Sequence, residues 1–160
     1  MKLEYFYIKG FRRIKESKII CGDATFLIGE NNIGKSSVLK ALEYFFSDSV
    51  TLSDQDYFMI TESGFQADEI IFEAKFIEVP ETANTWRGFK GRIIKEVING
   101  ITTNTIYYRK IFNRNGAKRR EMKTFAKSLK TEFANSKNLN EFIAAGIEEN
   151  LINEIFQDYI

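Results

Sequence analysis

Residues 29–37 read Gly-Glu-Asn-Asn-Ile-Gly-Lys-Ser-Ser, and this stretch decides the fold that the sequence predicts. It fits the pattern G-x-x-x-x-G-K-[ST] of a P-loop, a glycine-rich turn that wraps phosphate groups between a strand and a helix. Residues 25–28 (Thr-Phe-Leu-Ile) form a short apolar run typical of a central parallel strand. Residues 35–46 place apolar side chains on one helical face. The stretch therefore predicts a phosphate-binding loop flanked by a buried strand and a helix.

Each residue type in the loop has a physical role in holding phosphate. Gly29 and Gly34 allow the backbone to turn tightly, so that successive N–H groups point at an anion. Lys35 is placed to reach β and γ phosphates, and the Ser36 hydroxyl is placed to bind Mg²⁺. We expect Ser37 to add a phosphate contact, beside the positive end of the helix dipole. The loop therefore predicts a ligand with β and γ phosphates, accompanied by Mg²⁺.

Composition limits the classes of protein that this chain can belong to. Its 160 residues, 44% apolar and 14% aromatic, predict a folded chain that we expect to form one domain, residues 1–160. The sequence lacks a run of about 18 apolar residues and a signal-peptide layout, so we expect a cytoplasmic protein without a membrane partner. The complete absence of histidine excludes a histidine base and a histidine-bound zinc site in this chain. The single cysteine, Cys21, is expected to be a small buried filler.

The first half of the chain predicts strands on both sides of the P-loop. Residues 3–9 read as a strand, and a second strand is expected near 18–21, directly before the P-loop strand. Residues 68–79 alternate between apolar and polar side chains, which indicates a half-buried strand ended by Pro80. Its acidic residues, such as Glu73, would then face solvent without binding a metal.

Turn signals predict an antiparallel meander in the second half. Strands at 92–98 and 101–112 flank Asn99-Gly100, the preferred pair for a type I′ hairpin turn. A second signal, Asn115-Gly116, is expected to begin another strand that reaches Phe125. The antiparallel region as a whole is expected over 68–125.

A helical pattern returns at residues 138–160. Asn138 or Asn140 is expected to cap a short helix through Ala145, and Gly146 is expected to close it. A second helix is expected to present one apolar face, made of Leu151, Ile152, Ile155, Phe156 and Tyr159.

The N-terminal third resembles a known group of ATPases. The opening YIKGFRRI (residues 7–14), followed by FLIGENNIGKSSVLKALEYFF (residues 26–46), resembles the start of ABC-type ATPases of the SMC/RecF/OLD group. Those proteins typically begin I-x-N-F-R-x-I and continue L-I-G-x-N-N-x-G-K-S-S-x-L-x-A-L-x-x-F-F. Within the group, DQDYF (residues 54–58) is similar to an acidic-aromatic step of OLD-family ATP-dependent endonucleases and their relatives in bacterial anti-phage defence. The resemblance is carried by residues 3–47.

The resemblance implies both a fold and a set of nucleotide contacts. It implies an α/β (α+β) fold, the N-terminal lobe of an ABC-type ATPase, with P-loop strand and helix in 1–47 beside the antiparallel layer. Asn31 and Asn32 would lie close to the phosphates. Arg12 or Arg13 would contact the ribose or the phosphates, although a solvated strand end is an alternative for both. Gln55 would sense Mg²⁺ and the γ-phosphate.

Charge is distributed unevenly along the sequence. Residues 83–130 hold thirteen basic and two acidic side chains, whereas residues 43–82 hold one basic and ten acidic. Since aromatic residues are interleaved with the basic ones, the basic block predicts contacts with DNA phosphates. The alternatives are a solvated sheet face or a patch that pairs with an acidic neighbour. The candidate DNA-binding residues are Arg109, Lys110, Arg114, Lys118, Arg119 and Arg120.

The sequence lacks parts that a complete ATPase of this type needs. It contains no apolar run followed by Asp-Glu (Walker B), no signature loop and no Toprim nuclease centre, so we expect no catalytic residue within this chain. The leading hypothesis is an ATP- and Mg²⁺-binding N-terminal lobe of an OLD-like DNA-processing ATPase. Its partners would be the remainder of the ATPase or nuclease, in the same chain or another subunit, a second copy of the lobe, and DNA.

Two other functions remain open at this point. One is a non-catalytic assembly or interaction module with a vestigial P-loop. The other is a small P-loop kinase, against which the Asn99-Gly100 hairpin region speaks, because kinases of that class are built on parallel sheets.

Overall fold

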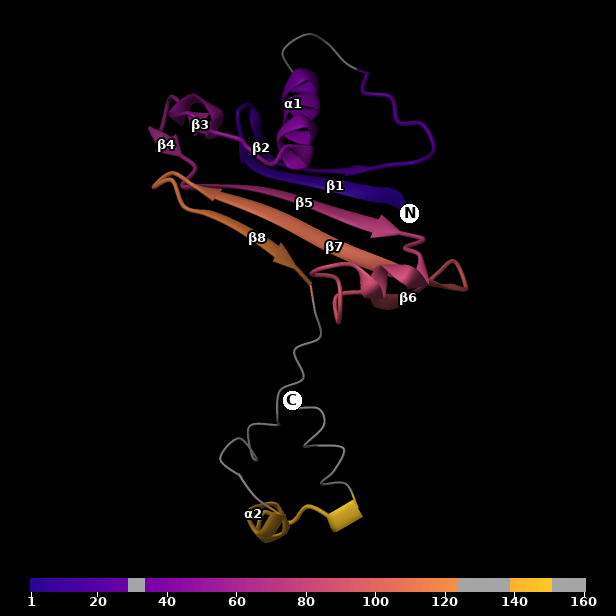
Figure 1. Cartoon of the computed structure of the whole chain (residues 1–160). Helices are drawn as coiled ribbons and strands as arrows, with labels where there is room; N and C mark the ends of the chain where they lie inside the picture. Colours follow the sequence, from indigo (N-terminus) through magenta and orange to yellow (C-terminus); the bar gives the residue numbers. More distant parts are fainter. Residues whose placement is uncertain (29–33, 124–138, 151–160) are drawn as a thin grey trace. The chain divides into compact units, whose positions relative to one another are not determined.

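The computed structural model describes residues 1–28, 34–123 and 139–150. The chain divides into two compact units, Met1–Thr124 and Phe125–Ile160. The larger unit is a twisted sheet with the helix α1 (Lys35–Phe46) lying on one face (Figure 1).

The sheet of the larger unit is antiparallel throughout its described pairs. The strand order is β2-β1-β5-β7-β6, and β8 also pairs with β7. The strands are β1 (Lys2–Phe11), β2 (Ile14–Ile20), β5 (Glu69–Ile77), β6 (Ile94–Ile98), β7 (Ile101–Asn113) and β8 (Lys118–Met122). The predicted α/β (α+β) fold with an antiparallel layer is thus confirmed.

Short elements complete the described chain. Between α1 and β5 lie the 3-10 helix η1 (Asp54–Asp56) and the two-residue strands β3 (Met59–Ile60) and β4 (Phe65–Gln66), and η2 (Glu81–Thr85) follows β5. In the second unit, α2 (Leu139–Ala144) is followed by Gly146 at φ +86°, as the sequence predicted. The second predicted helix, from Leu151 onward, lies outside the described residues. Among the described helices, none is long and apolar enough to cross a membrane.

The core lies between α1 and one face of the sheet. The alternation predicted for β5 is confirmed, because Ile70, Phe72 and Ala74 are each 0% exposed. From α1, Ala41 is fully buried and Phe45 is 3% exposed. This packing of an amphipathic helix on alternating apolar positions fixes α1, and with it the end of the P-loop, against the sheet.

Local turn chemistry sets the hairpins, as the sequence predicted. Asn99 (φ +51°) and Gly100 (φ +78°) both adopt positive φ, which a type I′ turn requires. Gly116 (φ +87°) lies in the turn before β8, which ends at Met122 rather than continuing to Phe125. The meander is therefore present, with a shorter last strand.

The other face of the sheet carries paired charges. The Lys75 Nζ lies 2.7 Å from a Glu4 carboxylate oxygen and 2.9 Å from one of Glu96. Glu73 was expected to face open solvent, but its side chain is only 16% exposed because Arg109 on the neighbouring strand pairs with it. Among the described residues, no cluster of acidic, cysteine or histidine side chains could hold a metal ion. The face that carries Glu73 is therefore more enclosed than expected.

The strand predicted at residues 25–28 is not formed. The segment has no strand structure, and Phe26 is 81% and Ile28 90% exposed. A parallel strand is stable only when neighbouring strands take up its backbone groups, and the described sheet is antiparallel and lies elsewhere. The apolar run that predicted a buried strand is thus an exposed apolar segment in this chain.

Candidate functional site

The described end of the P-loop is suited to an anion. Gly34, at φ +103°, is the N-cap of α1 and has no side chain to satisfy the first amides of the helix. The first turn of α1 contains no acidic residue, so nothing there offsets the positive end of the helix dipole. Lys35 is the first helical residue, followed by the exposed Ser36 and the 5% exposed Ser37. Gly29, Asn31 and Asn32 lie outside the described residues.

A hollow of about 430 Å³ adjoins this helix end. Gly34 and Lys35 line it together with Arg13, which lies in the turn between β1 and β2. The structure therefore brings Arg13 into the same hollow as the P-loop lysine, whereas Arg12 does not line it. Sequence reasoning left the choice between the two arginines open.

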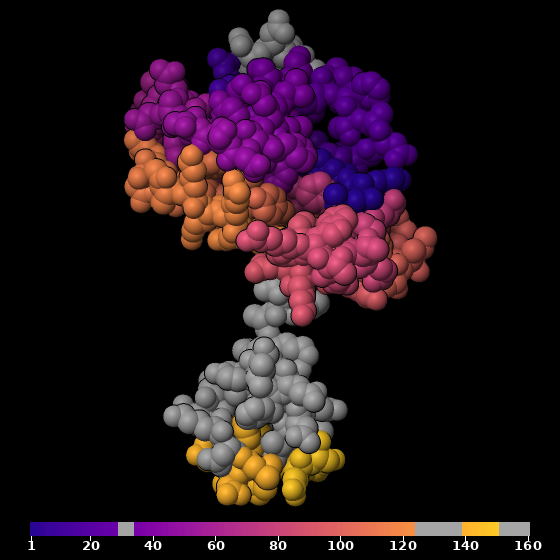
Figure 2. All heavy atoms as spheres, viewed as in Figure 1, coloured from indigo at the N-terminus to yellow at the C-terminus, as the bar shows by residue number. Residues whose placement is uncertain are grey.

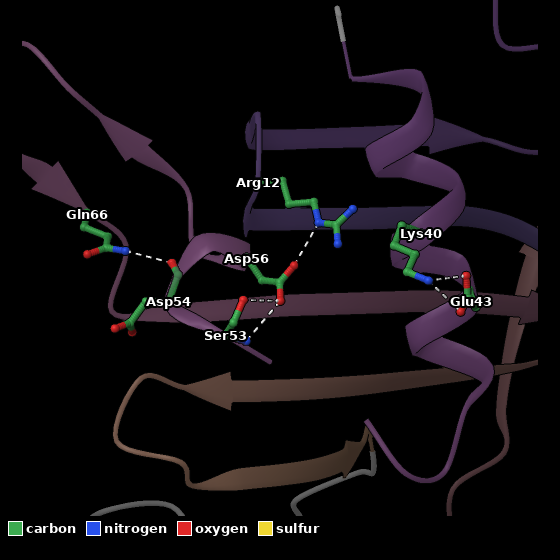
Figure 3. Close-up of polar contacts among 7 residues, drawn as sticks. All are labelled: Arg12, Lys40, Glu43, Ser53, Asp54, Asp56 and Gln66. Atoms are coloured by element: carbon green, nitrogen blue, oxygen red, sulfur yellow. Dashed lines mark hydrogen bonds and ion pairs between the residues drawn. The ribbon is translucent and has the colours of Figure 1, made fainter. Parts of the chain in front are cut away.

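Arg12 is held by a carboxylate on the far side of the turn. Its Nε donates a hydrogen bond to Asp56 Oδ1 at 2.8 Å, and its backbone N–H donates to the Asp56 carbonyl oxygen at 2.7 Å. Figure 3 shows the two terminal nitrogens of Arg12 directed away from Asp56, toward the side on which α1 lies. Asp56 was missed as a functional candidate, although the spacing Ser53-x-x-Asp56 is a capping-box signal visible in the sequence.

Gln55 lies beside this pair. It is exposed in η1, directly before Asp56, and the preceding Asp54 carbonyl accepts a 2.9 Å hydrogen bond from the Gln66 side chain (Figure 3). The structure thus places Gln55 next to the Arg12–Asp56 pair and not in a described contact with Ser36.

Three of the candidate DNA-binding residues donate hydrogen bonds to the segment that follows α1. Lys110 Nζ donates to the Ser47 carbonyl oxygen at 2.8 Å, Arg120 Nη2 donates to the Asp48 carbonyl oxygen at 3.1 Å, and Lys118 donates to a carbonyl two residues further on. In Figure 2, β7 and β8 (orange) lie directly against the purple-magenta segment at and after α1. Carbonyl groups at a helix C-terminus are unpaired and carry partial negative charge, so cations there are stabilising.

The burial of Lys110 has an electrostatic consequence. Its residue is only 5% exposed, and burial, followed by repulsion from Arg120, lowers the pKa of its amine. A side chain so enclosed is poorly placed to contact a nucleic acid directly.

The other three candidates pair with acidic side chains. Arg109 lies on the opposite face from Lys110 and pairs with Glu73, Arg114 lies 3.7 Å from Asp54, and Arg119 lies 4.0 Å from Glu121. These three arginines of the basic block therefore have acidic partners within this chain, although the pairs of Arg114 and Arg119 are largely exposed and offset little of the positive charge. The side chains of Arg119 (56%) and Arg120 (57%) are more exposed than those of Arg109 (44%) and Arg114 (37%).

The environment of Asp56 predicts an acid-dependent loss of stability. Burial acts to raise the pKa of Asp56, but hydrogen bonds from the Ser53 backbone and from Arg12 outweigh it and hold the pKa below its usual value. A lowered pKa stabilises the fold above the unfolded-state pKa of about 3.9, and this contribution is lost as the pH falls through the lower folded-state value.

We therefore expect Asp56→Asn to destabilise the protein by about 1–3 kcal/mol at neutral pH and by progressively less below about pH 4. Urea unfolding of both proteins between neutral and acidic pH measures this difference. Asp54→Asn, which removes an exposed carboxylate of the same turn, is the control. A wild-type to Asp56→Asn difference that does not shrink in acid would contradict the assigned charge pair.

Comparisons with known proteins agree with this geometry. A family model described as "AAA ATPase domain" matches residues 1–159. No curated protein matches the sequence. Among solved structures, the SMC head domain from Thermotoga maritima is similar, with a TM-score of 0.52, 21% identity and coverage of 78% of this chain. The chain spans 38% of the length of that head domain.

A second solved structure has a similar fold. It is described as "Structural biochemistry of ATP-driven dimerization and DNA stimulated activation of SMC ATPases", and it matches with a TM-score of 0.51 and 13% identity over 100% of both chains. At these identities the two likenesses show the fold, a mixed α/β lobe with an antiparallel sheet like that of SMC heads.

Proposed function

The chain belongs to the AAA ATPase domain family, and from that membership we propose that it is the ATP- and Mg²⁺-binding N-terminal lobe of an OLD-like, DNA-processing ATPase. The observation that carries the proposal is the placement of Lys35 at a helix N-terminus without a side-chain cap, in one hollow with Arg13. A lysine, an arginine and the amides of a helix N-terminus are the groups that bind phosphate in water-filled clefts.

The residues present fit a nucleotide with its metal ion. Lys35 would hold the β and γ phosphates and Arg13 the phosphates or ribose from the side. The exposed Ser36 hydroxyl would bind Mg²⁺, which would neutralise phosphate charge. From the sequence motif, Gly29, Asn31 and Asn32 would also contact the phosphates. Gly34 and Ser37, at the end of the loop, would be the remaining phosphate contacts.

The exposed segment at 25–28 supports the proposal that this lobe is completed by further polypeptide. Phe26 and Ile28 are large, mostly exposed apolar side chains directly before the P-loop, and they line the same hollow as Lys35. A strand from the remainder of the ATPase, in the same chain or another subunit, would bury these side chains. The remainder would also supply the Asp-Glu pair of Walker B, which this sequence lacks. A nuclease centre and a role in anti-phage defence would likewise come from that remainder.

Two further partners belong to the proposal. One solved relative of the fold is described by ATP-driven dimerization and DNA-stimulated activation of SMC ATPases, and we propose that this lobe also pairs with a second copy and responds to DNA in the cytoplasm. Arg119 and Arg120 also have partners within the chain, but their side chains are more than half exposed, so the DNA contact would rest on them.

Nucleotide titration tests the proposed function. We expect Lys35→Ala to weaken Mg²⁺-ATP binding at least about thirtyfold, or about 2 kcal/mol, because it removes the charged partner of the phosphates. Isothermal titration calorimetry on the whole chain measures the affinity. Lys40→Ala removes a lysine of the same helix that pairs with Glu43, and it should bind ATP like the wild type. Equal affinity in the wild type and Lys35→Ala would favour the alternative of an assembly module with a vestigial P-loop.

A further inference from the structure

The turn between β1 and β2 has an unusual backbone. Arg12 is a non-glycine residue at φ +50°, a left-handed conformation that side chains disfavour. The turn contains only Arg12 and Arg13, because Phe11 already pairs with Ile14 across the hairpin. The conformation of Arg12 therefore sets the direction in which Arg13 leaves the turn.

Asp56 holds this strained residue at two points, through its side chain and through its backbone carbonyl. The strand end beside it is joined to the same segment, because the Phe58 N–H donates to the Gly10 carbonyl oxygen at 2.8 Å and Phe11 forms a β-bridge with Tyr57. Residues 56–58 thus lie antiparallel beside residues 10–12. The turn is anchored by this segment over three successive positions.

The Asp56 carboxylate is itself fixed, because both of its oxygens accept hydrogen bonds within the chain. Its Oδ2 accepts hydrogen bonds from the Ser53 backbone N–H at 3.0 Å and from the Ser53 hydroxyl at 3.1 Å, while Oδ1 accepts from Arg12. The Asp56 side chain is 9% exposed. A carboxylate whose two oxygens both accept bonds inside the protein is a holder of Arg12 and not a ligand for a metal ion.

We infer that Asp56 is a positioning residue for nucleotide binding, which fixes the Arg12 turn and thereby presents Arg13 to the phosphates beside Lys35. This inference rests on the proposed function. The 3-10 helix η1 also carries Gln55, the candidate sensor of Mg²⁺ and the γ-phosphate. The Asp56 carboxylate therefore connects the arginine turn to η1. Any shift of that segment on nucleotide binding would be transmitted to the arginine turn through these contacts, the Arg12–Asp56 ion pair among them.

A double-mutant cycle tests the inference. Mg²⁺-ATP affinity is measured by calorimetry for the wild type, Asp56→Asn, Arg13→Ala and the double variant. If Asp56 acts through Arg13, each single change weakens binding about tenfold and the double variant is no weaker than about tenfold. A role in general stability alone would make the effects multiply to about a hundredfold, and that result would overturn the inference.

The controls separate positioning from folding. Asp54→Asn, in the same turn, should leave ATP affinity within about twofold of the wild type. Should Asp56→Asn fail to fold, Ser53→Ala replaces it in the cycle, because it removes the hydroxyl hydrogen bond to Asp56 Oδ2 while the backbone hydrogen bond and the charge pair with Arg12 remain. Ser53→Ala is then expected to weaken Mg²⁺-ATP binding about threefold in the wild-type background and not at all in the Arg13→Ala background. An equal loss of affinity in both backgrounds would overturn the inference.

The outcomes also separate this inference from the proposed function. If the wild type binds ATP and Lys35→Ala does not, but Asp56→Asn binds normally, the positioning role alone is wrong. If the folded wild-type chain binds no nucleotide, the proposed function and the inference fall together.

Discussion

Replacing Gly10 with alanine is expected to lower the free energy of unfolding by about 3 kcal/mol. Gly10 lies within β1 at φ +72°, where a side chain is strained. A Cβ atom there would also overlap the Glu69 backbone carbonyl oxygen of the neighbouring strand and lie 3.2 Å from the Ala67 Cβ. Since the Glu69 carbonyl belongs to β5, which pairs with β1, one strand has to move away from the other.

Gly64→Ala is the matched control. Gly64 has a similar φ of +66°, but a Cβ atom there would meet nothing within 4 Å. Its replacement should cost about 1 kcal/mol, from backbone strain alone. Urea unfolding followed by circular dichroism measures both variants. Equal losses would show that β1 and β5 are not in close contact at Gly10. We also expect Gly10→Ala to weaken ATP binding, because the Gly10 carbonyl anchors the segment that holds Arg12.

The parts of the fold with local signals were predictable from the sequence. The bounds of α1 follow from its apolar face, and the β6–β7 hairpin follows from Asn99-Gly100. The burial of Ile70, Phe72 and Ala74 follows from alternation. In each case the residues that determine the structure lie within a few positions of each other, so periodicity and turn chemistry were sufficient.

The strand expected at residues 25–28 shows where such reasoning fails. Its apolar run indicates that the segment is favourable to bury, but it does not indicate which strand would lie beside it. The described sheet offers no parallel neighbour, so Phe26 and Ile28 remain exposed. The prediction was wrong for this chain because strand formation depends on partners that sequence periodicity does not encode.

The candidate site was predictable to a similar extent. The motif located Lys35 and Ser36, but the choice between Arg12 and Arg13 depends on Asp56, which lies 44 residues from Arg12 in the chain. The contacts of the basic side chains likewise depend on residues that are distant in the sequence, since Lys110 binds a carbonyl 63 residues away. Counting charges therefore predicted the quantity of positive charge and not where it is neutralised.

Replacing Phe72 with alanine is expected to lower the free energy of unfolding by about 3–5 kcal/mol, a loss at least as large as that expected for Gly10→Ala. Phe72 is 0% exposed at the centre of the core. Its ring lies 6.2 Å from that of Phe6, 5.1 Å from that of Phe11 and 5.8 Å from that of Phe112, measured between centroids. Truncation removes three ring contacts at once and leaves a cavity that rigid strands cannot close.

Phe46→Ala is the control, because Phe46 is 64% exposed at the end of α1 and its loss should stay below about 1 kcal/mol. Thermal and urea unfolding measure both variants, and a loss below about 1.5 kcal/mol for Phe72→Ala would contradict the packing of the three rings around Phe72. Phe72→Leu keeps most of the volume and should fold. Since Phe11 packs on Phe72 and directly precedes Arg12, that variant should also weaken ATP binding, which ties the core to the arginine turn.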